Sequence, residues 1–151
     1  MEMNILLAYI GVALVAGGSF MASAMAVSIC GQTVIGALKK RPDRFGTYLL
    51  LCALPTSQGI YGLAGFFLLQ PFLVPTITML QASAILGIGI VMTVAGIFAS
   101  IGQAKICANG IEATAAGHNV TGQTLTMAVF PELFGIFSFL VLFLVRATLL
   151  V

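Results

Sequence analysis

The residue with the clearest chemical potential is Glu132, which lies inside the apolar stretch 124–145. A carboxylate near the middle of a membrane-spanning helix costs several kcal/mol to insert, and such residues typically mark proton or ion pathways. Glu132 is therefore a candidate carrier of a proton or a cation. The alternative is a carboxyl that only ties helices together through a hydrogen bond.

A second group of polar residues occupies one short segment of the first half of the chain. Leu54, Ser57, Gln58 and Tyr61 stand at positions i, i+3, i+4 and i+7, which is one face of a helix. This face presents a hydroxyl, an amide and a phenol. Pro55 lacks a backbone donor, so it should bend the helix and loosen nearby carbonyls.

Gln103 is the third candidate. It lies about as far before one polar loop as Glu132 lies after it, and Gln58 lies similarly far beyond the other loop. The three side chains can therefore meet at one depth in a membrane. Carboxylate, amide and hydroxyl oxygens are what a hard cation requires, whereas a proton needs only the carboxyl. Ordinary hydrogen bonds between helices, worth under about 1 kcal/mol each, remain the alternative for the amides and the hydroxyl.

The composition tells what must position these residues. Only 7% of the 151 residues are charged and 60% are hydrophobic, whereas about a quarter of a soluble domain is charged. No charge occurs between Glu2 and Lys39 or between Arg44 and Lys105, and about 20 apolar residues span a bilayer. We expect an all-α membrane protein forming a single membrane domain, 1–151. Its four transmembrane helices are expected at about residues 4–38, 46–70, 77–115 and 122–147.

Charge also predicts the orientation. Most of the Lys and Arg residues crowd into residues 39–44, and short basic loops stay in the cytoplasm. Loops 39–45 and 116–121 are therefore expected in the cytoplasm, with both termini outside. No Walker A loop, dinucleotide fingerprint or nucleophile elbow occurs. We expect neither nucleotide nor nucleic acid as a partner.

The chain repeats itself. Small residues recur at every fourth position in the first and third apolar segments, at an offset of 78 residues. They are Gly18, Ala22, Ala26 and Cys30, and then Gly96, Ser100, Ala104 and Ala108. The second and fourth segments carry most of the phenylalanines. This pattern predicts two duplicated helical hairpins, each with a slim and a bulky helix, which would assemble side by side into a ring. A four-helix monomer is the alternative.

Several short motifs resemble a known family. They are Leu-Pro-Thr-Ser-Gln-Gly-Ile-Tyr-Gly at 54–62, Gly-Gln-Ala-Lys at 102–105, Phe-Pro-Glu-Leu-Phe-Gly at 130–135 and Arg-Pro-Asp-Arg-Phe-Gly at 41–46. With the duplicated hairpin, they look like the rotor-ring proteolipid of V-type and A-type ATPases. In bacteria this is subunit K, the doubled relative of the smaller F-type proteolipid. The resemblance implies a homo-oligomeric ring of about ten copies.

The resemblance also implies a site. The ligands of the sodium-binding branch fall on the Leu54 backbone carbonyl, Ser57, Gln58, Gln103 and Glu132. Tyr61 would hydrogen-bond the carboxylate and hold the site closed. Ser57 stands where sodium-binding members have Thr, and Leu133 stands where a Thr-like or Val-like residue is common. Because serine keeps the oxygen, Na+ is the expected ion, with H+ alone as the alternative.

The implied function is translocation of Na+ or H+ by reversible binding at Glu132, coupled to ATP hydrolysis or synthesis in other subunits. The chain would be no enzyme by itself. Its implied partners are a stator membrane subunit, central-stalk subunits and the lipid bilayer of a bacterial cell membrane. The alternative is a small four-helix proton-coupled multidrug exporter, which would want a roomy aromatic cavity, often with Trp, and this sequence has no Trp. A purely structural scaffold would leave Glu132 unexplained.

Overall fold

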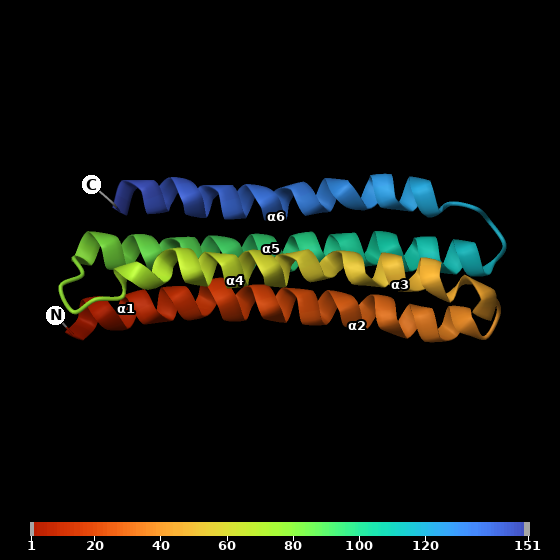
Figure 1. Cartoon of the computed structure of the whole chain (residues 1–151), viewed down its shortest axis with the longest axis horizontal. Helices are drawn as coiled ribbons and strands as arrows, with labels where there is room; N and C mark the ends of the chain where they lie inside the picture. The colour runs from red at the N-terminus through yellow and green to blue at the C-terminus, as the bar shows by residue number, and fades with distance from the viewer. Residues whose placement is uncertain (1, 150–151) are drawn as a thin grey trace.

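The computed structural model describes residues 2–149 as a bundle of four long helices that run alternately up and down (Figure 1). Each of the four is long and apolar enough to cross a membrane. Residues 2–149 contain no strand. The protein is therefore an all-helical, multi-pass membrane protein, and the sequence prediction of its fold class is confirmed.

The bounds of the four spans are as follows. The first joins α1 (Glu2–Ala13) to α2 (Ser19–Leu38) through a π-helical turn, Leu14–Gly18. The second contains α3 (Phe45–Ala53) and α4 (Ser57–Leu69), with 3₁₀ turns at Pro42–Arg44, Leu54–Thr56 and Gln70–Phe72. The third and fourth are α5 (Met79–Ala115) and α6 (Thr121–Leu149).

Local signals set two helix starts. α3 begins at Phe45, after a 3₁₀ turn that starts with Pro42, and proline suits the first position of a helix. α5 begins at Met79, directly after Thr78, which caps it. Thr78 Oγ1 accepts a hydrogen bond from the Gln81 N–H at 3.2 Å, and Gln81 Oε1 accepts one from the Thr78 N–H at 3.1 Å.

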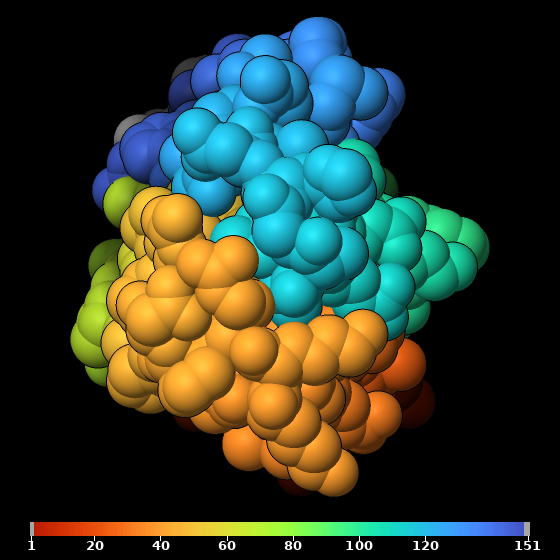
Figure 2. Space-filling view, turned by 90° about the vertical axis from the view of Figure 1, so that its right-hand side faces the viewer, coloured from red at the N-terminus to blue at the C-terminus, as the bar shows by residue number. Residues whose placement is uncertain are grey.

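The chain folds as two helical hairpins that point the same way. Both termini lie at one end of the bundle, and the loops joining α2 to α3 and α5 to α6 lie at the other (Figure 1). Figure 2 looks onto the loop end and shows the two loops side by side. Arg41 and Arg44 of the first loop line a small crevice together with Gly117 and His118 of the second.

The two ladders of small residues lie against each other between α2 and α5. All of the ladder residues are buried. Cys30 Sγ donates a weak hydrogen bond to the Ala104 carbonyl oxygen at 3.4 Å. A Cβ added at Gly96 would lie 3.9 Å from the Ala22 Cβ. The small side chains thus allow the close helix packing on which membrane proteins depend.

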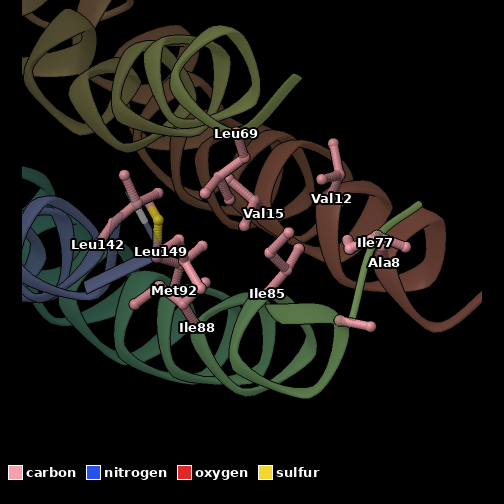
Figure 3. Close-up of a cluster of buried hydrophobic side chains, with 11 residues drawn as sticks. Ala8, Val12, Val15, Leu69, Ile77, Ile85, Ile88, Met92, Leu142 and Leu149 are labelled. Carbon is pink, nitrogen blue, oxygen red and sulfur yellow. The ribbon is translucent and has the colours of Figure 1, made fainter. Parts of the chain in front are cut away.

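Two clusters of buried apolar side chains hold the bundle together and leave a polar level between them. One cluster lies toward the termini, where side chains from all four spans converge (Figure 3). The other lies toward the loops. Along α6, Glu132 lies between Ala128 of the loop-side cluster and Leu142 of the terminal cluster. Along their own helices, Gln58 and Gln103 likewise lie between residues of the two clusters, so three polar side chains share one depth.

Candidate ion-binding site

Glu132 of α6 receives hydrogen bonds from three side chains of α4. Ser57 Oγ donates to Glu132 Oε2 at 2.8 Å, and Tyr61 OH donates to Glu132 Oε1 at 2.6 Å. Gln58 Nε2 also donates to Oε2, at a longer 3.4 Å. Both carboxyl oxygens therefore act as acceptors. The helical face inferred from the sequence spacing is the face that meets the carboxyl group.

Tyr61 is held by more than its hydrogen bond. Its ring stacks on Phe139 of α6, with ring centroids 5.6 Å apart and ring planes inclined by 19°. Stacking of this kind adds about 0.5–1.5 kcal/mol to the burial of the rings. The phenol is thus anchored to the same helix as the carboxyl group that it contacts.

Gln103 of α5 approaches the site without contacting Glu132 through a hydrogen bond. Its Nε2 donates to the Ala128 carbonyl oxygen at 3.2 Å. Its Oε1 is buried and has no hydrogen-bond partner among residues 2–149. A buried acceptor without a partner costs about 1–3 kcal/mol. Gln103 therefore carries an oxygen that is free to accept a donor or a cation.

A cavity of about 290 Å³ lies next to the carboxyl group. It is lined by Leu54, Ser57, Gln103, Leu125, Ala128, Val129 and Glu132. Four of the five residues that the resemblance implies as ligands thus border one space. Gln58, which is 2% exposed, reaches Glu132 but does not line this cavity. The Leu54 carbonyl oxygen accepts a hydrogen bond from the Ser57 N–H at the end of its 3₁₀ turn.

Gly135 of α6 packs against the side-chain amide of Gln58. A Cβ added at Gly135 would overlap the side-chain amide of Gln58, so the glycine leaves room for that amide in the position it occupies. Sequence reasoning assigned no role to Gly135. A signal was nevertheless present, because a glycine three positions after Glu132 lies on the same side of α6.

Ser23 of α2 is a second residue that sequence reasoning missed. Its Oγ donates to the Pro55 carbonyl oxygen at 2.8 Å and accepts from the Gly59 N–H at 2.8 Å. Ser23 is one of three serines in α2, and their spacing gave no pattern from which this contact could be inferred. The backbone on both sides of Ser57 and Gln58 is thereby tied to α2.

Two other buried polar groups lack partners among residues 2–149. They are the Tyr48 hydroxyl and Ser100 Oγ, both on fully buried residues. Neither residue lines the cavity beside Glu132. They lie outside the candidate site.

The protein-family comparison finds one family twice in this chain. The family described as the C subunit of ATP synthase matches residues 10–69 and residues 86–145. Each matched block contains most of one helical hairpin, and together the blocks cover well over half of the chain. The duplication inferred from the ladders of small residues agrees with this double match.

Two relatives cover most of the chain. It is 30% identical to the V-type sodium ATPase subunit K of Enterococcus hirae over 122 residues. The aligned residues make up 81% of this chain and 78% of that protein. It is 28% identical to the A-type ATP synthase subunit K of Methanocaldococcus jannaschii over 137 residues. The aligned residues make up 91% of this chain and 60% of that protein. Both relatives are thus named as K subunits, one of a sodium ATPase and one of an ATP synthase.

Proposed function

This chain belongs to the C-subunit family of ATP synthases as a doubled rotor-ring proteolipid of the V and A types, and we propose that its Glu132 carries Na+ across the membrane. The chain is a membrane subunit and not itself the catalytic enzyme. ATP is hydrolysed or made in other subunits, and ring rotation couples that reaction to ion movement. Because the relatives are ATPase subunits, we do not retain the exporter alternative.

One observation carries the proposal. Glu132 and Gln103 border the same cavity, and the Oε1 of Gln103 has no hydrogen-bond partner in the described part of the chain. Ser57 supplies a hydroxyl oxygen at its edge, and Leu54 contributes backbone to the wall. The walls of this space are mostly apolar, but the few oxygens beside it are of the kind that a hard cation prefers. A site built for a proton alone would not need the oxygen of Gln103.

Glu132 accepts hydrogen bonds at both of its carboxyl oxygens, from Ser57 and Gln58 on one side and from Tyr61 on the other. An isolated charge cannot remain against lipid, so the carboxylate needs either a cation or a proton there. We prefer Na+, because Gln103 offers a further oxygen at the same cavity, in line with the sodium-named relative from Enterococcus hirae.

Release requires the carboxylate to part from these donors. At a stator subunit, a fixed positive charge would compete with Na+ for Glu132 and draw the ion off toward water. Tyr61 would then lose its 2.6 Å contact and regain it after reloading. Moving one charge across 100 mV is worth about 2.3 kcal/mol, which ATP hydrolysis elsewhere in the complex can drive.

The proposal includes the surroundings of the chain. About ten copies would form the ring, which would contact a stator membrane subunit and central-stalk subunits. Loop 39–45 carries four of the six Lys and Arg residues, and loop 116–121 lies beside it at the same end of the bundle. We therefore propose that loops 39–45 and 116–121 face the cytoplasm, and that both termini face outward, in a bacterial cell membrane.

The test is labelling of Glu132 with a hydrophobic carbodiimide, which reacts with the carboxyl group. Millimolar Na+ should protect Glu132 of the purified ring, whereas the same concentration of choline chloride should not. Glu112 of α5 is exposed and provides the internal control, since Na+ should leave its labelling unchanged. Equal labelling of Glu132 with and without Na+ would show that the site does not bind Na+.

The substitution Glu132→Gln tests the carrier role. It removes the charge and keeps the size, so we expect assembled rings that no longer transport ions in the reconstituted complex. The matched variant Glu112→Gln, near the loop end of α5, should transport normally. Transport that survives in Glu132→Gln would refute the role of Glu132.

A further inference from the structure

Ser23 on α2 reaches into the backbone of the second span. Its Oγ lies 2.8 Å from both the Pro55 carbonyl oxygen and the Gly59 amide nitrogen. In a regular α-helix, a carbonyl and the amide four residues later bond directly to each other. A side chain inserted at such a pair opens the helix locally. The 3₁₀ turn Leu54–Thr56 lies at this place.

The bridged segment carries two of the donors to the carboxyl group. Ser57 and Gln58 lie between Pro55 and Gly59, and both donate to Glu132. The two ends of the segment are thus fixed to α2, while its side chains face α6. Any shift of this turn would move the Ser57 hydroxyl relative to the cavity that it lines.

The contact depends on close packing of the two helices. A Cβ added at Gly59 would lie 3.4 Å from Ser23 Oγ and 3.6 Å from Ser23 Cβ. An added methyl group would thus make only ordinary van der Waals contact with Ser23, so the two helices lie close together here without a steric clash. Ser28, also on α2, behaves differently, since its Oγ donates to the Ala24 carbonyl oxygen of its own helix. That is the ordinary local bond of a serine in a helix.

We propose that Ser23 is a positioning residue of the ion site. It does not touch Glu132, and it acts by holding the Pro55–Gly59 turn at the spacing that presents Ser57 and Gln58 to the carboxylate. This inference rests on the proposed function. It adds α2, in the first span, to a site whose other residues lie in the second, third and fourth spans.

The experiment titrates Na+ against carbodiimide labelling of Glu132 in purified rings. Ser23→Ala removes the bridge, and loss of one well-placed hydrogen bond corresponds to a Na+ requirement about fivefold higher. Ser23→Thr keeps the hydroxyl and should restore the wild-type midpoint. Ser28→Ala is the matched control and should also titrate like the wild type. Ser23→Cys, close in volume and a weak donor, should fall between Ala and Thr.

The outcomes separate this inference from the proposed function. If Na+ protects the wild type and all four variants equally, the positioning role is wrong. If Ser23→Thr is as impaired as Ser23→Ala, Ser23 serves packing and not positioning. If Na+ fails to protect even the wild type, the sodium site is wrong. The inference is then judged by the pH profile of labelling, which Ser23→Ala must displace and Ser23→Thr must not.

Discussion

The oxygen of Gln103 provides the sharpest test of the site. Among residues 2–149 its Oε1 has no hydrogen-bond partner, while its Nε2 bonds to the Ala128 carbonyl oxygen at 3.2 Å. We consider Gln103→Met, which keeps the length of the side chain and removes both polar atoms. The substitution relieves an orphaned acceptor that costs about 1–3 kcal/mol and loses one hydrogen bond worth about 1 kcal/mol. Without Na+, the variant should therefore be more stable by about 0–2 kcal/mol per chain.

With Na+ bound, the comparison changes. At a concentration 100 times the dissociation constant, Na+ stabilises the wild type by about 2.7 kcal/mol. Loss of one oxygen ligand, at about 1.4 kcal/mol, corresponds to tenfold weaker binding. The same Na+ concentration then stabilises Gln103→Met by only about 1.4 kcal/mol. The increment that Na+ adds should thus be about halved by the substitution.

The assay is thermal dissociation of the purified ring in detergent, in NaCl and in choline chloride of equal ionic strength. Ser100→Ala is the control. It removes a buried hydroxyl that also has no hydrogen-bond partner within residues 2–149, and Ser100 does not line the cavity. Its effect should be the same in both salts. If Na+ raises the dissociation temperature of Gln103→Met as much as that of the wild type, Gln103 is not a ligand and the reasoning fails.

Two further substitutions probe the walls of the site. Tyr61→Phe keeps the stack on Phe139 and removes the donor to Glu132 Oε1. Since hydrogen bonds to charged groups are worth about 1.5–3 kcal/mol, the Na+ concentration for half-protection should rise about ten- to hundredfold. An unchanged midpoint would contradict the closing role of Tyr61. Gly135→Ala would push a methyl group into the Gln58 amide and should lower ring stability by about 1–3 kcal/mol, measured by thermal dissociation. Gly122→Ala, whose added Cβ meets open space, should leave stability nearly unchanged, and equal effects of the two would refute the steric argument.

The sequence predicts the parts of the fold that depend on periodicity. Four apolar stretches define four helical spans, because backbone N–H and C=O groups in lipid must be hydrogen-bonded within the protein, as they are in a helix. The helical period places Ser57, Gln58 and Tyr61 on one face, and the structure directs that face at Glu132. Their roles as ligands stay predictions until an ion is measured.

Other features could not be read from the sequence, because they depend on how two helices approach each other. The π-helical turn at Leu14–Gly18 has no signature in the sequence, yet Thr93 Oγ1 donates to the Leu14 carbonyl oxygen there at 2.9 Å. The bond from Gln103 Nε2 to the Ala128 carbonyl oxygen likewise joins a side chain to the backbone of another helix. Such bonds follow from packing, which spacing along one helix does not determine.

The two hairpins of this chain converge on a single carboxyl group instead of forming two separate sites. Gln58 of the first hairpin donates its amide to Glu132 of the second. Under the proposed function, four helices therefore move one charge. Under the proposed function, a ring of given circumference passes fewer ions per revolution than one with an acid in every hairpin. Since the nucleotide reaction delivers a fixed free energy per revolution, each ion receives a larger share. A low number of ions per revolution suits a rotary ATPase that pumps against a steep electrochemical gradient, because each elementary charge requires about 2.3 kcal/mol per 100 mV.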